Sequence, residues 1–372
     1  MKNIKIIHFV KGRADPNTSN GVNIVIHNLA SEQKKLNIDT EVWGITKNIH
    51  LNKHRHNYPL SLFKQKIIFK LDFNLIKRIN NLKENTIVHF HSGFIIEFYL
   101  IAKILKKRGI KWIITPHSLF YSKKKNTFKQ MLKFFYKFFF EDFIIKNTSA
   151  IHALSEEESK LWSREIKKNK IYIIPNGVRK SLLFKKKYLK NKIFSICYCG
   201  RIAIFQKGLD LLLLAINELK KKNYRIYLNI IGDGHQKSKL EKMAYNLKID
   251  DMITFHGNKI GNNKKKLIVK NDIFIHTSRF EGIPMAVLEA ASLGMPLVIS
   301  KNTNLSKFII KANSGYVIKS LQIKHISETI EKIIKNRNKI KKMGINSRMM
   351  AIGNFSWKKI AITLNKKIYS QI

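Results

Sequence analysis

Residues 272–300 read DIFIHTSRFEGIPMAVLEAASLGMPLVIS, and this stretch decides the fold. An apolar run ends in HTS, a loop follows, Pro284 begins a helical pattern, and Gly294 with Pro296 ends that pattern before a second apolar run. Both apolar runs are continuous rather than alternating, which is typical of strands buried on both faces of a parallel sheet. The stretch therefore predicts a strand–helix–strand unit.

The same pattern recurs along the whole chain. Short apolar runs, among them IKIIHFV, TIVHFHS, KWIITPHS, FSICYCG and IYLNIIGDG, alternate with amphipathic stretches such as GLDLLLLAINELKKKN. Strands separated by helical stretches of this length are typical of parallel sheets. The expected fold class is α/β, with two Rossmann-like doubly wound domains facing a central cleft in which ligands bind.

Chain length and one break in the pattern predict the domain limits. A chain of 372 residues exceeds what one hydrophobic core usually supports. An Asn-Gly turn at 176–177 leads into a Lys-rich, weakly patterned segment, which places the domain boundary near 178–191. We expect a first domain at 1–180, a linker at 181–191, a second domain at 192–355, and a final helix at 356–372 that packs back on the first domain.

The composition is that of a globular protein with a strongly basic surface. The chain has 71 Lys and Arg residues against 24 Asp and Glu residues, a formal net charge of +47. This charge suits a polyanion or an anionic membrane, but a solvated, lysine-rich surface explains it equally, so both interpretations stay open. No apolar run reaches the roughly 20 residues of a membrane-spanning helix, and a signal-peptide pattern is absent, so we expect a cytoplasmic protein.

Two acidic residues, Glu281 and Glu289, interrupt the decisive stretch. Their spacing corresponds to about 12 Å along a helix axis. A carboxylate can accept hydrogen bonds from both hydroxyls of a sugar diol. The amides at the helix start between them, those of Gly282, Ile283 and Met285, suit a phosphate. One ligand touching all three groups is one interpretation; the other has Glu281 facing the helix dipole and Glu289 pairing with a lysine.

Cations and histidines follow other buried strands. Arg201 comes directly after FSICYCG, and Lys207 directly before the helical stretch that starts at Gly208, so the two predict an anion site at a sheet edge. A plain surface position for either cation is the alternative. His91 and His117 lie at the ends of TIVHFHS and KWIITPHS, and on the residues alone both are expected to be structural histidines.

Taken together, these motifs resemble one enzyme family. The order G-R-x5-K-G-L-D, followed further along by S-R-F-E-G-x-P-x-x-x-L-E-A, is similar to the retaining glycosyltransferases of family 4, which have the GT-B fold. The motifs NGVNIVIHNLA, ITPHS, IHALSEEE, IIPNGV and IIGDG agree with the family in order. The resemblance therefore covers nearly the whole chain.

The resemblance implies a division of roles. Arg201 and Lys207 would neutralise the diphosphate of a sugar nucleotide held by the second domain. Glu289 would bind its ribose hydroxyls, and Glu281 would hold the transferred sugar near the reacting carbon. His117 matches the active-site histidine of the family's acceptor-binding first domain, whereas His91 stays undecided.

Further residues match the family's donor-binding positions: Gly21, Gly232, Gly282, Ile283 and Met285. The chain departs from the family pattern at two places. Asn20-Gly21 stands where the family has Gly-Gly, in a turn that Asn tolerates. Ser118 follows His117 where the family has glycine, which alters the loop beside the acceptor.

The implied activity is that of a metal-independent hexosyltransferase without a cofactor. It would move a sugar from a UDP- or GDP-linked donor to a glycan or an undecaprenyl-type lipid-linked acceptor, in O-antigen, capsule or other surface-polysaccharide biosynthesis. Nucleic acid is not an expected partner. The alternatives are a sugar-nucleotide epimerase or hydrolase on the same fold, and a non-catalytic protein that binds polyanions or membranes. A nicotinamide enzyme is disfavoured, because the first loop lacks G-x-G-x-x-G.

Residues 122–147, SKKKNTFKQMLKFFYKFFFEDFIIKN, mix lysines with many aromatic side chains. Their apolar positions are too numerous for a single helical stripe. We expect the segment either to lie partly on an anionic membrane surface, which would place the protein peripherally on the inner face of the cell membrane, or to form a crossover helix of the first domain.

Overall fold

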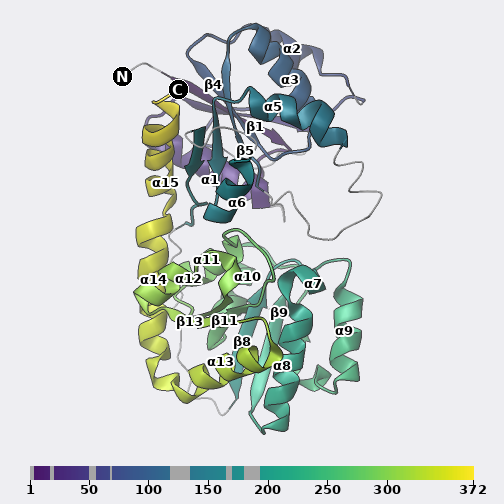
Figure 1. Cartoon of the computed structure of the whole chain (residues 1–372), viewed down its shortest axis with the longest axis vertical. Coiled ribbons are helices and arrows are strands. Elements are labelled where there is room, and N and C mark those ends of the chain that lie inside the picture. The colour runs from purple at the N-terminus through teal and green to yellow at the C-terminus, as the bar shows by residue number, and fades with distance from the viewer. Residues whose placement is uncertain are drawn as a thin grey trace. The chain divides into compact units, whose positions relative to one another are not determined.

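The chain forms two compact units (Figure 1). The computed structural model describes residues 4–16, 21–49, 56–67, 69–117, 135–164, 170–179 and 193–372. Unit 1 consists of Met1–Gly177 and Trp357–Ile372, and unit 2 of Val178–Ser356. The chain thus leaves unit 1 once and returns to it, while the predicted linker 181–191 lies outside the described residues.

Unit 1 holds a seven-stranded sheet in the order β3-β2-β1-β4-β5-β6-β7, with all neighbours parallel. Its strands are β1 Lys5–Lys11, β2 Thr40–Thr46, β3 Leu60–Lys64, β4 Thr86–His91, β5 Lys111–Thr115, β6 Ala150–Ala153 and β7 Ile171–Ile173. Its helices are α1 Gly21–Lys35, α2 Phe73–Asn80, α3 Ile96–Lys107, η2 Lys137–Glu141, α5 Asp142–Lys146, α6 Glu156–Trp162, α15 Trp357–Leu364 and η7 Asn365–Tyr369.

Alternation along the strands gives this sheet two different faces. Phe9 of β1 and Phe90 of β4 pack with α2, α3 and α5 into an apolar core. Their neighbours His8 and His89 point to the opposite face, because successive side chains of a strand alternate. There His8 meets Gln33 of α1, and His89 meets the end of η7. One face is thus apolar, and the other carries buried histidines.

Unit 2 holds a six-stranded parallel sheet in the order β10-β9-β8-β11-β12-β13. Its strands are β8 Phe194–Cys199, β9 Ile226–Ile231, β10 Ile253–Phe255, β11 Ile273–His276, β12 Leu297–Ser300 and β13 Gly315–Ile318. Its helices are α7 Ile204–Lys207, α8 Leu209–Lys221, α9 Lys237–Asn246, η4 Asp250–Met252, α10 Gly261–Val269, α11 Met285–Ser292, η5 Lys301–Thr303, α12 Ser306–Ala312, α13 Ile323–Lys335, η6 Arg337–Lys339 and α14 Ile340–Phe355. Two apolar cores cover the sheet, one with α8, α9 and α13 and one with α10, α11, α12 and α14.

The decisive stretch forms the predicted unit. β11 and β12 are fully buried and pair in parallel, with α11 between them. Gly294 has a positive φ of 80° after the helix ends, which suits a residue without a Cβ. Pro284 lies directly before the helix rather than within its first turn. The α/β class with two doubly wound sheets is confirmed.

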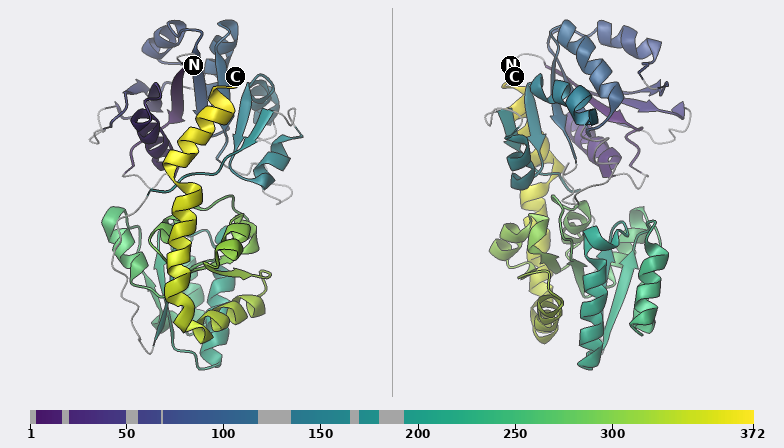
Figure 2. Two further views of the ribbon diagram at one scale, coloured as in Figure 1. Left: turned by 90° about the vertical axis from the view of Figure 1, so that its left-hand side faces the viewer. Right: turned by 45° about the vertical axis from the view of Figure 1, so that its right-hand side comes forward.

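The C-terminal segment belongs to unit 1, where it is drawn in yellow (Figure 2). α15 contacts α1, and the ring of Trp357 lies directly against Gly177, where a Cβ would overlap it. The side chain of Tyr369 is fully buried. Within the described ranges, no helix combines the length and apolarity that crossing a membrane requires.

Gly232, which follows β9, should tolerate no side chain. Its φ is +144°, and a Cβ would overlap the carbonyl oxygen of Gly200. We expect Gly232→Ala to lower the free energy of unfolding by at least about 2 kcal/mol, because both strain and overlap oppose it. Differential scanning calorimetry of the full chain measures this.

Gly353→Ala is the matched control. Gly353 lies exposed in α14, where a Cβ would meet nothing within 4 Å. Alanine there should raise stability by up to about 1 kcal/mol, because glycine is the weaker helix former. Equal effects of the two substitutions would show that close backbone packing at Gly232 is unimportant.

Candidate functional site

Glu281 lies in the loop between β11 and α11, and three side chains bind its carboxylate. One carboxylate oxygen accepts a hydrogen bond from the ammonium group of Lys207. The other accepts from Nε2 of His276 at 2.7 Å and from the hydroxyl of Ser278 at 3.0 Å. Glu281 and Lys207 were predicted from separate motifs, and the structure brings them together.

These partners decide the charge of Glu281. Burial by itself raises the pKa of the carboxyl group, but His276 and Lys207 together outweigh burial and hold the pKa well below its ordinary value. Glu281 is therefore ionised at neutral pH. Lys207, which is only 7% exposed, finds in it the counter-charge that a buried ammonium group requires.

His276 was missed in the sequence. It is the last residue of β11, is almost fully buried, and its ring stacks with that of Tyr198 at an interplanar angle of 10°. Because a carboxylate only accepts hydrogen bonds, Nε2 of His276 carries the proton that Glu281 accepts. The available signal was a polar residue ending a buried strand.

Arg279 fastens this loop to α8 and was also missed. Its guanidinium group makes two 2.7 Å hydrogen bonds to the carboxylate of Asp210 and lies 4.5 Å above the ring of Phe205. A second attachment comes from Thr277, whose hydroxyl donates to the backbone carbonyl oxygens of Lys207 and Gly208 at 3.0 Å. The loop that carries Glu281 is therefore held at the start of α8.

The two predicted cations differ in environment. Lys207 is buried and paired, as described above. Arg201 is exposed, and among the described residues it donates one hydrogen bond, from Nη2 to Gln206 at 3.0 Å. Most of its donors thus face solvent, which suits a ligand with several oxygen atoms.

Glu289 lies on α11 and forms an ion pair with Lys264 of α10 at 2.7 Å. Both side chains are 22% exposed. Burial lowers the pKa of Lys264, but the interaction with Glu289 outweighs burial and raises that pKa overall, so Lys264 is charged. A lysine partner was one of the two interpretations of Glu289, and the sequence did not identify Lys264 as that partner.

Three backbone amides remain available at the start of α11. Gly282, Ile283 and Met285 are partly exposed. Within the described part of the chain, none of their N–H groups donates a hydrogen bond. Unpaired amides at a helix N-terminus favour an anion, because the helix dipole adds a partial positive charge. Gly232 lies at the end of another strand of the same sheet.

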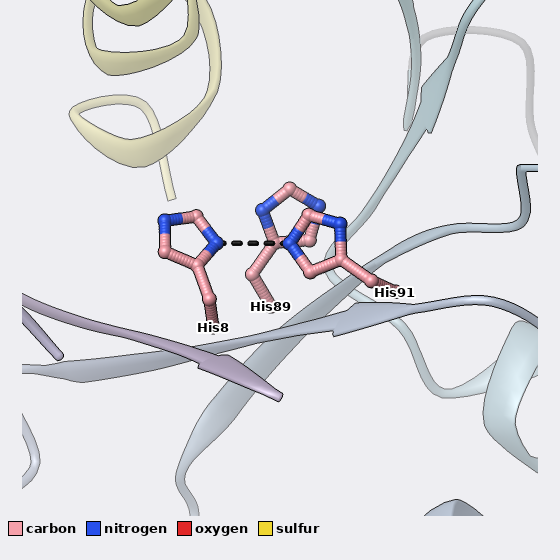
Figure 3. Close-up of side chains that lie close together, drawn as sticks. All are labelled: His8, His89 and His91. Carbon is pink, nitrogen blue, oxygen red and sulfur yellow. Dashed lines mark hydrogen bonds between the residues drawn. The ribbon is translucent and has the colours of Figure 1, made fainter. Parts of the chain in front are cut away.

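In unit 1, His117 follows β5 in a left-handed backbone conformation, with a φ of 56°. Its Nε2 lies 3.0 Å from Nδ1 of His91, the last residue of β4. His91 in turn lies 2.9 Å from His8 of β1, and Figure 3 shows His8, His89 and His91 pointing toward one another. Gly21, the other prediction in this unit, is the first residue of α1.

Burial makes these histidines weak bases. It lowers the pKa of His8 and His152 to about 4 and that of His117 to about 3, and it holds the pKa values of His89 and His91 well below 6.5. All five are neutral at pH 7. Of the five, only His91 and His117 were candidates from the sequence. The alternation of histidine with apolar residues in IIHFV and IVHFH was the signal for His8 and His89.

Five neutral histidines predict a loss of stability in acid. The unfolded chain binds protons below pH 6.5 that the folded chain excludes until about pH 4, so stability is full above pH 6.5 and falls as the pH drops. Each histidine contributes about 1.4 kcal/mol per pH unit in that window. We expect the Tm in calorimetry to fall between pH 6.5 and 4.5.

Two buried acids act in the opposite sense and provide the control. Burial raises the pKa of Glu141 and of Glu158 to about 7, so each favours the folded state more as the pH falls. Replacing both by Gln should make the Tm fall more steeply as the pH decreases. A wild-type Tm that is constant or rises toward pH 4.5 would contradict the neutral state of the histidines.

Two family models match the chain, one over each part. "Glycosyltransferase Family 4" matches residues 19–182, and "Glycosyl transferases group 1" matches residues 180–350. An uncharacterized glycosyltransferase of Methanocaldococcus jannaschii is 28% identical over 335 residues, which cover 85% of this chain and 81% of that protein.

Two further proteins are similar. A capsular polysaccharide biosynthesis glycosyltransferase, CapM of Staphylococcus aureus, is 24% identical over 249 residues, covering 60% of this chain and 62% of that protein. The solved structure of Anabaena HepE in complex with UDP has a TM-score of 0.76 at 15% identity and covers 99% of this chain and 100% of that one.

Proposed function

Because the chain belongs to the family 4 glycosyltransferases and has the GT-B fold, we propose that it moves a hexose from a UDP- or GDP-linked donor to a hydroxyl group of a surface glycan or its lipid-linked precursor. The similar proteins support this choice, since one is named for capsular polysaccharide biosynthesis and another was solved with UDP. The proposed setting is the assembly of an O-antigen, a capsule or a related polysaccharide at the cytoplasmic face of the membrane.

The carboxylate of Glu281 carries the proposal. A carboxylate offers about four lone-pair sites, and Lys207, His276 and Ser278 occupy three of them. The side chain is 21% exposed, so an acceptor site remains for a hydroxyl group of the transferred sugar. Because Arg279 and Asp210 hold the loop, this site is rigid before the donor arrives.

The donor diphosphate is assigned to Arg201 and to the amides of Gly282, Ile283 and Met285. The guanidinium group of Arg201 is exposed to solvent, and the three amides are unpaired in the described part of the chain. Lys207 contributes its charge at the same loop, since it neutralises Glu281 and so keeps that carboxylate from repelling phosphate oxygens. These groups would stabilise the negative charge that develops on the leaving diphosphate.

The donor ribose is assigned to Glu289. Its ion pair with Lys264 leaves carboxylate lone pairs for the two ribose hydroxyls and fixes the orientation of the group. The ion pair with Lys264 and the binding of ribose by Glu289 are thus compatible.

The acceptor is assigned to unit 1, where His117 would contact the reacting sugar.

We propose a same-face displacement in which the leaving diphosphate takes the acceptor proton and the anomeric configuration is retained. No metal takes part in this scheme, because Arg201 and the helix amides supply the charge. Proton NMR of the first-formed glycoside reads the configuration, and an inverted product would contradict retention.

Substitution of the two acids should separate donor binding from transfer. Glu289→Ala removes the ribose contact, so we expect UDP or GDP, whichever the wild type binds, to bind about 10- to 100-fold more weakly in calorimetry. Glu281→Gln keeps the shape of the loop but removes its charge. We expect its kcat to fall at least about 100-fold, with nucleotide affinity within about threefold of the wild type.

Glu241→Ala is the matched control, because Glu241 forms an exposed i,i+4 pair with Lys237 on α9. It should change neither quantity. Unchanged nucleotide affinity in Glu289→Ala would remove Glu289 from the donor site. Release of free sugar or its epimer by the wild type without acceptor would instead favour the epimerase or hydrolase alternative.

We also propose that unit 1 approaches an anionic membrane with the segment at 122–147, of which residues 135–147 are described. Phe138 and Phe139 on η2 are 63% and 59% exposed, and Lys146 on α5 is also well exposed. Exposed aromatic rings beside lysines suit an interface with anionic lipids. A lipid-linked acceptor would be reached from such a surface.

Vesicle sedimentation tests this surface. We expect the wild type to bind phosphatidylglycerol vesicles at low salt. Binding should be about tenfold weaker after Phe138→Ser with Phe139→Ser, because the two aromatic rings that would enter the lipid surface are lost. Phe73→Ser on α2, where Phe73 is 76% exposed, is the control and should bind like the wild type. Equal binding by both variants would exclude the η2 surface.

A further inference from the structure

The buried face of the unit 1 sheet contains two series of hydrogen-bonded side chains. The first begins at the carbonyl oxygen of Ile174, which lies 2.7 Å from Nε2 of His152. A carbonyl only accepts, so Nε2 of His152 carries the proton, and its Nδ1 must accept from the hydroxyl of Thr115 at 2.7 Å. Thr115 then accepts from Nε2 of His89 at 2.6 Å, and Nδ1 of His89 accepts from the hydroxyl of Tyr369 at 2.8 Å.

The second series begins at Gln33 of α1. The amide oxygen of Gln33 lies 2.6 Å from Nε2 of His8, whereas its amide nitrogen has no hydrogen-bond partner in the described part of the chain. The oxygen is therefore the end of the amide that faces His8.

The second series continues to His117. The oxygen of Gln33 only accepts, so Nε2 of His8 carries its proton, and Nδ1 of His8 accepts from Nε2 of His91 at 2.9 Å. Nδ1 of His91 accepts from Nε2 of His117 at 3.0 Å. Each ring is neutral and has a single N–H. The one ring nitrogen without an assigned role in the described part of the series is Nδ1 of His117, and it carries a lone pair.

A metal ion does not fit these histidines. One ring nitrogen from each of His8, His89 and His91 lies within 4.8 Å of the others. However, both nitrogens of every ring already have a hydrogen-bond partner, and the three side chains are at most 1% exposed. A metal would have to break these bonds and enter a closed core. The hydrogen bonds account for the cluster without one.

We propose that His91, His8 and Gln33 are positioning residues that hold His117 as its Nε2–H tautomer, so that Nδ1 accepts a hydrogen bond from a substrate hydroxyl. This rests on the placement of His117 at the substrate under the proposed function. Because the pKa of His117 is only about 3, the ring orients the hydroxyl and does not remove its proton at pH 7. Proton removal then falls to the leaving diphosphate.

Long-range 1H–15N NMR of the full chain labelled with 15N-histidine tests the tautomer. His117→Asn identifies the His117 signals by their loss. At pH 7 we expect a pyridine-type shift at Nδ1 and a pyrrole-type shift at Nε2 in His8, His89, His91, His117 and His152. A proton on Nδ1 of His117, or a charged ring, overturns the proposal on the wild type alone.

One variant tests whether the second series sets that tautomer. Gln33→Leu lies away from the substrate and should move the two His117 shifts toward each other. Gln33→Leu should also lower kcat about tenfold, with the KM for donor within twofold, since a fraction of His117 then presents N–H instead of a lone pair. Unchanged His117 shifts in Gln33→Leu would overturn the positioning role.

Tyr58→Phe is the matched control. It removes a buried hydrogen bond of 3.0 Å to His27 in the same unit but outside the series, so neither the His117 shifts nor kcat should change. Failure of the proposed function is distinguishable: His117→Asn with full transfer activity would remove His117 from the substrate while leaving the tautomer measurements valid.

Discussion

The buried ammonium group of Lys207 constrains the site of unit 2. An unpaired charge at 7% exposure would cost several kcal/mol, so the loop after β11 must bring a carboxylate to it. That carboxylate belongs to Glu281. Its position depends in turn on the two hydrogen bonds that the guanidinium group of Arg279 donates to Asp210. The acid is therefore ionised and partly exposed, and its loop is rigid. A short strand-to-helix connection thereby becomes a prepared binding surface.

The sequence predicted the parts of this surface whose signals are local. Continuous apolar runs identified β11 and β12, and glycine with proline marked the end of α11. Glu281 and Lys207 were chosen from different motifs, each for its position at a strand or helix end. That they neutralise each other could not be read from spacing, because the ion pair joins residues 74 positions apart.

Long-range pairing also explains what was missed. Lys264 is one of 71 Lys and Arg residues, and no local pattern distinguishes it as the partner of Glu289. His8 and His91 lie 83 positions apart and meet because β1 and β4 are sheet neighbours. The alternation of histidine with apolar residues showed which face of each strand the rings occupy. Strand order, which decides which rings meet, required the structure.

The return of the chain to unit 1 affects the order in which the protein is made. Unit 2 is continuous in sequence, so every residue of its two cores has been synthesised by Ser356. Unit 1 begins first, yet Tyr369, whose hydroxyl bonds His89 from 280 positions away, is among its last residues to leave the ribosome. During synthesis unit 2 can complete its packing while unit 1 still lacks α15 and Tyr369. Unit 1, although it begins earlier in the sequence, is therefore the last to acquire its full core.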